Sequence, residues 1–207
     1  MKKQITAILT TAMMLCTSIP AVAVPLEISV SAENVSSIDV GKLGDLTYHK
    51  YDDHVEIIGC TLTSPHVAIP AMIDGLPVTV IAEGAFDGCT SLSSVFSYAS
   101  NLEVISANAF AGCTNLTDVV LQARALKEIG ERAFADCPYL DSFSSMSDTC
   151  EIFDSPDTIP AKVIRAHEGS TAIAYAEKYG IAYEFTEPYD TVNVDGVVYI
   201  VYKDHAE

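Results

Sequence analysis

The chain has 207 residues, of which 49% are hydrophobic and 19% are charged, so it has enough apolar material for a core. It carries 28 Asp and Glu against 11 Lys and Arg, and its net charge at pH 7 is −17. Nucleic-acid backbones and anionic membrane surfaces repel a chain this acidic, and the charge therefore argues against both as partners.

Residues 1–32 have the features of a secretory signal peptide. Two lysines follow the first Met, and residues 5–19 form an apolar run. Ala23 and Ala32 each end a small-x-small triplet, so we expect cleavage after one of the two. The run is too short for a membrane span, which predicts a secreted, extracellular chain with no transmembrane span after cleavage. Attachment to a cell surface would require a region that is not in this chain.

Residues 33–44 are small, polar and glycine-containing, and we expect a linker there. From Leu46 the residues alternate as strands do, in L-T-Y-H-K-Y and then in H-V-E-I-I-G-C. They predict a β-hairpin that precedes the repeats and covers the first coil. V-A-I-P, a turn at Asp74 and Gly75, and P-V-T-V-I follow over residues 67–81. This segment predicts an atypical first repeat, because a terminal repeat has a neighbour on one side only.

Three segments then carry one pattern: I-A-E-G-A-F-D-G-C-T-S-L-S-S-V, I-S-A-N-A-F-A-G-C-T-N-L-T-D-V and I-G-E-R-A-F-A-D-C-P-Y-L-D-S-F. Equivalent residues lie 24 positions apart at three places in the pattern: Phe86, Phe110 and Phe134; Cys89, Cys113 and Cys137; Leu92, Leu116 and Leu140. A fixed period without insertions is typical of a solenoid in which each copy forms one stacked coil. We expect the aligned Phe, Leu and Cys side chains to share a continuous interior.

Each copy is expected to contain one short strand. In the second copy, Val119 and Leu121 should point into the coil, because side chains alternate along a strand. Asp118, Val120 and Gln122 should then point outward.

The remainder of each copy should return to the core from the other side. Ile129 is expected to enter the interior there, and Phe134 to lie on a short helical turn. Gly88 and Gly112 precede the repeated Cys and suit a left-handed turn. Asp136 takes this place in the third copy, which Asp tolerates better than most residues.

Residues 163–166 and 181–185 are expected as strands on either side of a helix. Ser170 or Thr171 would begin this helix as its N-cap, and Gly180 would end it. Four residues form one face of the helix: Ala172, Tyr175, Ala176 and Tyr179. We expect the helix to close the open end of the stack.

Residues 188–207 suggest a linker and the start of a second copy of the module. Five residues recur at an offset of 151, where Tyr48, Tyr51, Asp53, His54 and Glu56 match Tyr199, Tyr202, Asp204, His205 and Glu207. The hypothesis is that the chain is the N-terminal part of a longer protein with at least two such modules. A chance match within a short strand is the alternative.

Five cysteines follow the expected signal peptide: Cys60, Cys89, Cys113, Cys137 and Cys150. Secreted proteins often form disulfides, but the number here is odd and three of the five lie at the repeat period. A repeated Cys suits the interior as a small apolar side chain, so we favour reduced thiols. A bridge between neighbouring coils is the alternative, because strands about 4.8 Å apart are within reach of disulfide geometry.

The segments A-F-D-G-C-T-S-L, A-F-A-G-C-T-N-L and A-F-A-D-C-P-Y-L resemble the BspA-type leucine-rich repeats of bacterial surface and secreted proteins. The likeness covers about residues 45–187. It implies an α/β repeat solenoid whose leucine-rich-repeat coils carry short strands and short helical turns, with an N-terminal β-hairpin cap and a C-terminal helical cap. Ser97 and Ser145 depart from the pattern, because the second copy has Leu121 at this place, and we expect looser packing there.

The same resemblance implies a secreted or cell-surface protein with a non-catalytic role in adhesion or protein–protein interaction. The implied partner is a protein or a glycan on a host, a neighbouring cell or an extracellular scaffold. The alternative is a non-catalytic region of a larger modular extracellular enzyme, either carbohydrate-active or a peptidase, or of a scaffold-docked protein.

No motif in the chain indicates catalysis. The phosphate-binding G-x-x-x-x-G-K-S/T and the G-x-S-x-G of hydrolases are absent, as is a C-x-x-C pair for zinc. Asp52, Asp53 and His54 are close in sequence, and we interpret them as a solvated turn rather than a cation site. We therefore expect no catalytic residue, no metal and no cofactor.

The outward strand positions form the candidate binding site: Ser94, Phe96, Tyr98, Asp118, Val120, Gln122, Ser142, Ser144 and Met146. Four of them would make an apolar patch on an acidic protein: Phe96, Tyr98, Val120 and Met146. Aromatic and Met side chains suit the centre of interfaces, and exposed apolar patches often mark partners. The alternative is that Phe96 and Tyr98 tuck under a neighbouring loop.

Overall fold

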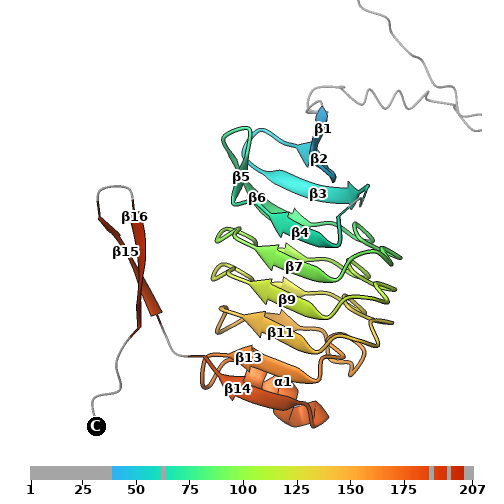
Figure 1. Cartoon of the computed structure of the whole chain (residues 1–207), viewed down its shortest axis with the longest axis vertical. Coiled ribbons are helices and arrows are strands. Elements are labelled where there is room, and N and C mark those ends of the chain that lie inside the picture. The colour runs from blue at the N-terminus through green and yellow to red at the C-terminus, as the bar shows by residue number, and fades with distance from the viewer. Residues whose placement is uncertain (1–38, 62–63, 187–188, 195–196, 203–207) are drawn as a thin grey trace, which may run out of the picture. The chain divides into compact units, whose positions relative to one another are not determined.

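The computed structural model describes residues 39–61, 64–186, 189–194 and 197–202 (Figure 1). The expected signal peptide, residues 1–32, lies outside these ranges.

Three antiparallel strands open the described chain: β1 (Asp39–Leu43), β2 (Leu46–Lys50) and β3 (Val55–Cys60). The pairing of β2 with β3 confirms the expected hairpin. The expected linker over residues 33–44 is wrong for its second half, because β1 pairs with β2 along its whole length. The connection between them turns at Gly44, whose φ of 58° is left-handed.

The atypical first repeat forms a coil from β4 (His66–Ile69), β5 (Met72–Ile73) and β6 (Leu76–Ile81). Asp74 and Gly75 both have positive φ, at 51° and 80°, and turn β5 back onto β6. Strand β6 then pairs in parallel with β3, and β4 pairs in parallel with the first strand of the next coil.

The regular coils place their strands in two parallel sheets. One sheet contains β4, β7 (Ser94–Ser97), β9 (Asp118–Leu121), β11 (Ser142–Ser145), β13 (Val163–Ala166) and β14 (Ala182–Phe185). The other sheet continues from β6 through β8 (Val104–Ile105), β10 (Glu128–Ile129) and β12 (Glu151–Ile152). Val95 lies opposite Val119, and Val119 opposite Phe143, so the register advances by one 24-residue period per coil. Figure 1 shows β7, β9 and β11 stacked in this order.

The expected short helical turns are wrong. The segments around Phe86, Phe110 and Phe134 are successive hydrogen-bonded turns, and α1 is the one helix in the part of the chain that the structure describes. All three Phe amides donate to the next coil instead of within their own. The N–H of Phe86 bonds to the carbonyl of Ala109 at 2.7 Å, that of Phe110 to Ala133 at 2.8 Å, and that of Phe134 to Thr158 at 3.1 Å. The coils are therefore those of a β-solenoid, because ladders between coils take up donors that a helix would use internally.

Left-handed residues occur twice in each regular coil. Gly88, Gly112 and Asp136 have φ of 65°, 67° and 57°, which confirms the expected turn position. A second position, four residues earlier, was not expected; it holds Gly84, Asn108 and Arg132 with φ of 64°, 54° and 54°.

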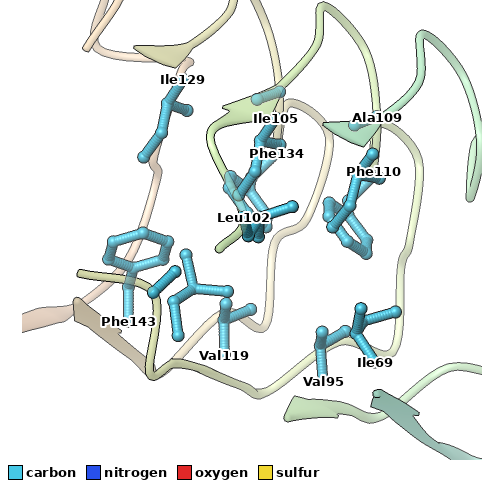
Figure 2. Packing of buried hydrophobic residues seen from close by; sticks show 14 of the residues in the cluster. Ile69, Val95, Leu102, Ile105, Ala109, Phe110, Val119, Ile129, Phe134 and Phe143 are labelled. Atoms are coloured by element: carbon cyan, nitrogen blue, oxygen red, sulfur yellow. The ribbon is translucent and has the colours of Figure 1, made fainter. Parts of the chain in front are cut away.

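The phenylalanine side chains stack along the interior. The ring centroids of Phe86 and Phe110 are 4.7 Å apart, and those of Phe110 and Phe134 are 5.0 Å apart, with interplanar angles of 8° and 2°. All three side chains are fully buried. Figure 2 shows Phe110 and Phe134 inside the coils, with Val95 and Val119 on one side and Ile105 and Ile129 on the other. The predicted continuous interior is confirmed for the aligned Phe and Leu side chains and for Cys113 and Cys137, whereas Cys89 is partly exposed.

Buried serines occupy one corner of the first and third regular coils. The hydroxyl of Ser97 accepts a hydrogen bond from the N–H of Ala99, and that of Ser145 from the N–H of Ser147, both at 3.3 Å. In both coils the serine side chain thus satisfies a backbone N–H in a local turn.

The chain then forms α1 (Thr171–Tyr179), which follows β13 and precedes β14. Ser170 is the N-cap, with its Oγ accepting from the N–H of Ile173, and Gly180 ends the helix with a left-handed φ of 68°. Tyr175 anchors the helix, because its buried hydroxyl donates to the carbonyl of Ser155 at 2.6 Å and accepts from the N–H of Ile159 at 3.1 Å.

The last described strands are β15 (Tyr189–Val194) and β16 (Val197–Tyr202), which form an antiparallel hairpin. Its inner pairs have the register of β1 and β2 at the offset of 151 noted in the sequence. Leu43 pairs with Leu46 as Val194 pairs with Val197. Asp39 pairs with Lys50 as Asp190 pairs with Val201, and the three pairs between these ends also correspond.

Candidate interaction surface

The outer side of the sheet that runs from β4 to β14 is the candidate surface, and we call it the strand face. Along each strand, one side chain points into the coil and the next points out. The inward residues Val95, Val119 and Phe143 are fully buried. One outward position lies in register from strand to strand across the sheet: Ala68, Phe96, Val120, Ser144, Arg165 and Glu184.

This row changes character along the strand face. It is apolar over the first coils and becomes charged at β13 and β14, where the Nε of Arg165 lies 2.7 Å from a carboxylate oxygen of Glu184. This ion pair satisfies the charges of Arg165 and Glu184. The apolar side chains of this row, the exposed Phe96 and the half-buried Val120, therefore lie over β7 and β9.

The aromatic residues of the expected site are exposed. Phe96 and Tyr98 are 39% and 57% exposed, so the alternative that they tuck under a loop is wrong. Gln122 is also exposed, and the remaining half-buried members of the expected site are Asp118, Val120, Ser144 and Met146.

Two residues of the expected site do not lie open to solvent, which corrects the prediction for them. Ser94 is 6% exposed, because its Oγ contacts the Nδ1 of His66 at 2.6 Å. Ser142 is 9% exposed, because Asp118 and Val163 flank it in the sheet.

A shallow groove of about 480 Å³ lies on the strand face over β4, β7 and β9. Its lining residues are His66, Ser93, Ser94, Phe96, Thr117, Asp118 and Val120. The structure thus brings together Ser94, Phe96, Asp118 and Val120 from the expected site. Tyr98, Gln122, Ser142, Ser144 and Met146 are not part of the lining.

The sequence reasoning missed His66, Ser93 and Thr117. Ser93 and Thr117 lie 24 residues apart, directly before their strands, so the repeat period could have identified them. His66 comes from the atypical first coil, and its neighbours in the groove follow only from the register of β4 with β7.

The polar groups of the groove are held by hydrogen bonds to one another. The Oγ1 of Thr117 donates to the Asp118 carboxylate at 2.7 Å and also contacts the carbonyl of Ser93 at 3.0 Å.

Ser94 and His66 form a Ser–His pair in the groove. Such a pair becomes nucleophilic when a third group orients the imidazole. In the described part of the chain, no carboxylate lies within ion-pair distance of the His66 ring. The groove therefore presents fixed polar atoms around an apolar centre.

A second hollow of about 440 Å³ lies between β12 and α1. Asp154 accepts hydrogen bonds there from Lys178 and from the hydroxyl of Tyr179, which lower the pKa of its carboxyl group. Burial raises the pKa of Tyr175 to about 12. These contacts join the helix to the last coils.

The described residues contain neither a membrane-spanning helix nor a metal-binding cluster. None of their helices combines the length and the apolar character needed to cross a bilayer. Nor do three or more His, Cys, Asp or Glu side chains among them gather into a group that could hold a metal ion. Asp53 and His54 instead form a turn, in which their side chains contact each other at 2.6 Å and the His54 ring stacks on Tyr51.

Solved structures of bacterial leucine-rich repeat proteins are similar to this chain, and the first of those named below shares its fold. A leucine-rich cell surface protein from Faecalibacterium prausnitzii is 22% identical, with a TM-score of 0.55 over 72% of this chain and 40% of its own. A leucine-rich repeat protein from Bacteroides capillosus is 23% identical, with a TM-score of 0.47 over 62% of this chain and 98% of its own. A leucine-rich repeat protein from T. pallidum is 24% identical, with a TM-score of 0.42 over 64% of this chain and 70% of its own. No curated protein matches the sequence.

The repeat period, the phenylalanine stack and the two parallel sheets agree with a family model that matches residues 67–155 in 6 copies. This model describes the BspA type leucine rich repeat region. Residues 67–155 of this chain therefore belong to the BspA-type leucine-rich repeat family.

Proposed function

We propose that this chain is a non-catalytic interaction module that acts outside the cell and binds a protein partner on its strand face. The observation that carries the proposal is the exposed Phe96 in the lining of a groove with fixed polar atoms. The family contains surface proteins, and the Faecalibacterium prausnitzii relative is described as a cell surface protein, which supports an extracellular location.

The composition of the groove favours a protein with an apolar anchor and basic neighbours. Phe96 and Val120 offer an apolar contact, and aromatic residues contribute strongly at interface centres. Asp118 lies beside them, and the chain as a whole has a net charge of −17. A partner with Lys or Arg around its anchor would be steered toward this surface, and its binding would weaken as salt increases.

We also propose that the strands β1–β3 and helix α1 act as end caps of the coils. Terminal coils lack a neighbour on one side and need a different element to cover the apolar interior. Tyr48, Val55 and Ile57 of the opening strands are buried in the same core as the coils, as are Ala172 and Tyr175 of the helix.

A second candidate function is that of a non-catalytic region within a larger modular extracellular protein. The shared register of β1–β2 and β15–β16 favours it, because a duplicated opening hairpin is what a second copy of the module would begin with. The complete reading frame tests this candidate. A downstream catalytic or scaffold-docking domain would support it, and a frame without a second repeat array would contradict the duplication.

Charge substitution on the strand face tests the main proposal. The double variant Phe96→Asp, Val120→Asp places two carboxylates in the groove, and the control Phe153→Asp changes an aromatic residue of similar exposure that follows β12 in the other sheet. Immobilised chain is incubated with extracellular proteins of the source environment and, separately, with a glycan array, and circular dichroism verifies the fold.

We expect specific proteins to bind the parent chain and the control, and to be lost from the double variant. If the parent chain bound glycans and no proteins, the partner would be a carbohydrate and the proposed protein partner would be wrong. Equal binding by all three chains would overturn the proposed surface.

A further inference from the structure

Two cysteines from different parts of the fold face each other at the beginning of the regular repeats. The Sγ of Cys60, the last residue of β3, lies 2.9 Å from the Sγ of Cys89 in the first 24-residue copy. This separation exceeds the length of a disulfide bond by about 1 Å. Both side chains are partly exposed, so an oxidant can reach them.

The other repeated cysteines have different surroundings. The thiol of Cys113 donates to the carbonyl of Phe86 at 3.1 Å, and that of Cys137 to the carbonyl of Phe110 at 3.3 Å. Both are buried, as is Cys150. Cys89 has the same place in its copy, but it is partly exposed and contacts Cys60, which lies in β3 outside the regular copies. The repeated Cys is therefore accessible to a reagent in the first copy and buried in the other two.

Two of the buried cysteines, Cys113 and Cys150, are also less reactive than an ordinary thiol. The contact with Cys137 and burial raise the pKa of the Cys113 thiol, and burial raises the pKa of Cys150 to about 12. Since the thiolate is the species that attacks a disulfide, these two buried residues are protected from exchange. The Cys60–Cys89 pair differs from them in its position in the fold and in its exposure.

We propose that Cys60 and Cys89 are a disulfide-forming pair that covalently joins strand β3 to the first regular coil. The oxidant is a low-molecular-weight disulfide or a thiol–disulfide oxidoreductase. The thiolate of one cysteine attacks a sulfur of this oxidant and releases a thiol; the second cysteine then attacks the mixed disulfide and releases another. One Sγ–Sγ bond forms, two thiols of the protein are oxidised, and the oxidant is reduced to two thiols that carry the two protons.

The bond would close a loop at the N-terminal end of the coils. Terminal units of repeat proteins have fewer neighbours and open more readily than central ones. A covalent link between residues 60 and 89 would make opening of β1–β3 dependent on opening of the first regular coil. We therefore expect oxidation to raise the midpoint of thermal unfolding by about 5 to 10 °C.

The whole chain is first reduced, freed of reductant and incubated with oxidised glutathione, and the remaining thiols are alkylated. The chain should lose two of its six thiols. A protease that cleaves after Glu56, Glu83 and Glu103 separates three cysteines, so mass spectrometry should find residues 57–83 linked to residues 84–103.

The single variants Cys60→Ser and Cys89→Ser should lose both the link and the rise in melting temperature. The control Cys113→Ser should keep both. The parent chain under reducing conditions provides the stability reference without any substitution, so a variant that fails to fold does not decide the outcome. Absence of the linked peptides after oxidation, or a link from residues 84–103 to residues 104–128, would overturn the proposal.

Discussion

Left-handed backbone conformations could be predicted from the sequence at some residues and not at others. The position of Gly88 and Gly112 was predicted because glycine tolerates a left-handed φ, and Asp136 is an accepted replacement. The position of Arg132 was missed, because arginine is a poor indicator of such a conformation. A hydrogen bond of 2.8 Å between the guanidinium of Arg132 and the Asp136 carboxylate now joins the two left-handed residues of this coil.

Gly130 provides a prediction at the same scale. A Cβ at this residue would lie 2.7 Å from the backbone nitrogen of Ala107 and 2.9 Å from the carbonyl carbon of Ser106, both in the preceding coil. Gly130→Ala should therefore lower the free energy of unfolding by about 1 to 3 kcal/mol, because the backbone must shift.

The matched control for Gly130 is Ser106→Ala, which changes the equivalent residue of the preceding copy, where a side chain is already present. It should change the stability by less than about 0.5 kcal/mol. Urea unfolding followed by circular dichroism compares the two. Equal losses would show that the close approach at Gly130 does not limit the packing of the coils.

At the scale of elements, the helix was predicted with both its ends, because capping residues act locally. Ser170 and Gly180 have the expected roles, and each depends on neighbours within a few residues. The two-residue strands β8, β10 and β12 were not predicted as strands, although Ile129 was expected in the core. Such short strands exist only through pairing with adjacent coils, and no local preference marks them.

Tyr175 in this helix should make the stability of the protein depend on pH. Burial raises the pKa of its phenol from 10.0 to about 12 in the folded state. Below about pH 10 the phenol is protonated in both states and its full contribution to stability is present. As the pH rises from 10 to 12, the unfolded state ionises first, so this contribution is progressively lost.

Tyr175→Phe should lower the free energy of unfolding at pH 7 by about 1 to 3 kcal/mol, because the carbonyl of Ser155 and the N–H of Ile159 lose their partner. The variant should also show a smaller decrease between pH 10 and 12 than the parent chain. The control Tyr139→Phe, at a 60% exposed residue, should follow the parent in both respects. Urea unfolding at each pH measures these changes, and an equally steep decrease in Tyr175→Phe would contradict the assignment.

At the scale of the whole molecule, stability is distributed over coils that contact their neighbours. The stacked rings of Phe86, Phe110 and Phe134 and the two parallel sheets repeat the same contacts at each interface. Energies of such arrays are approximately sums of coil and interface contributions. The register of the remaining coils should therefore tolerate the loss of one complete coil.

Deletion of residues 105–128 removes one period of 24 residues and joins Val104 to Ile129, which restores the V-I pair of β8. We expect a folded chain with cooperative unfolding and a lower melting temperature. Deletion of residues 105–116, half a period, should abolish the cooperative transition, because it puts strand and turn segments out of register. Circular dichroism and thermal unfolding compare the two, and equal behaviour would contradict a repeat-by-repeat architecture.

The period, the inward residues and the buried phenylalanine stack could be predicted from the sequence, because they follow from spacing along one strand or one copy. The sequence also identified Phe96 and Val120 as outward residues, from strand alternation alone. Three features required the folded chain: the turns and short strands of the return path, the groove lined by His66 and Thr117, and the contact between Cys60 and Cys89. The reason is that these features join residues of different coils, and their contacts arise only when the coils close and stack.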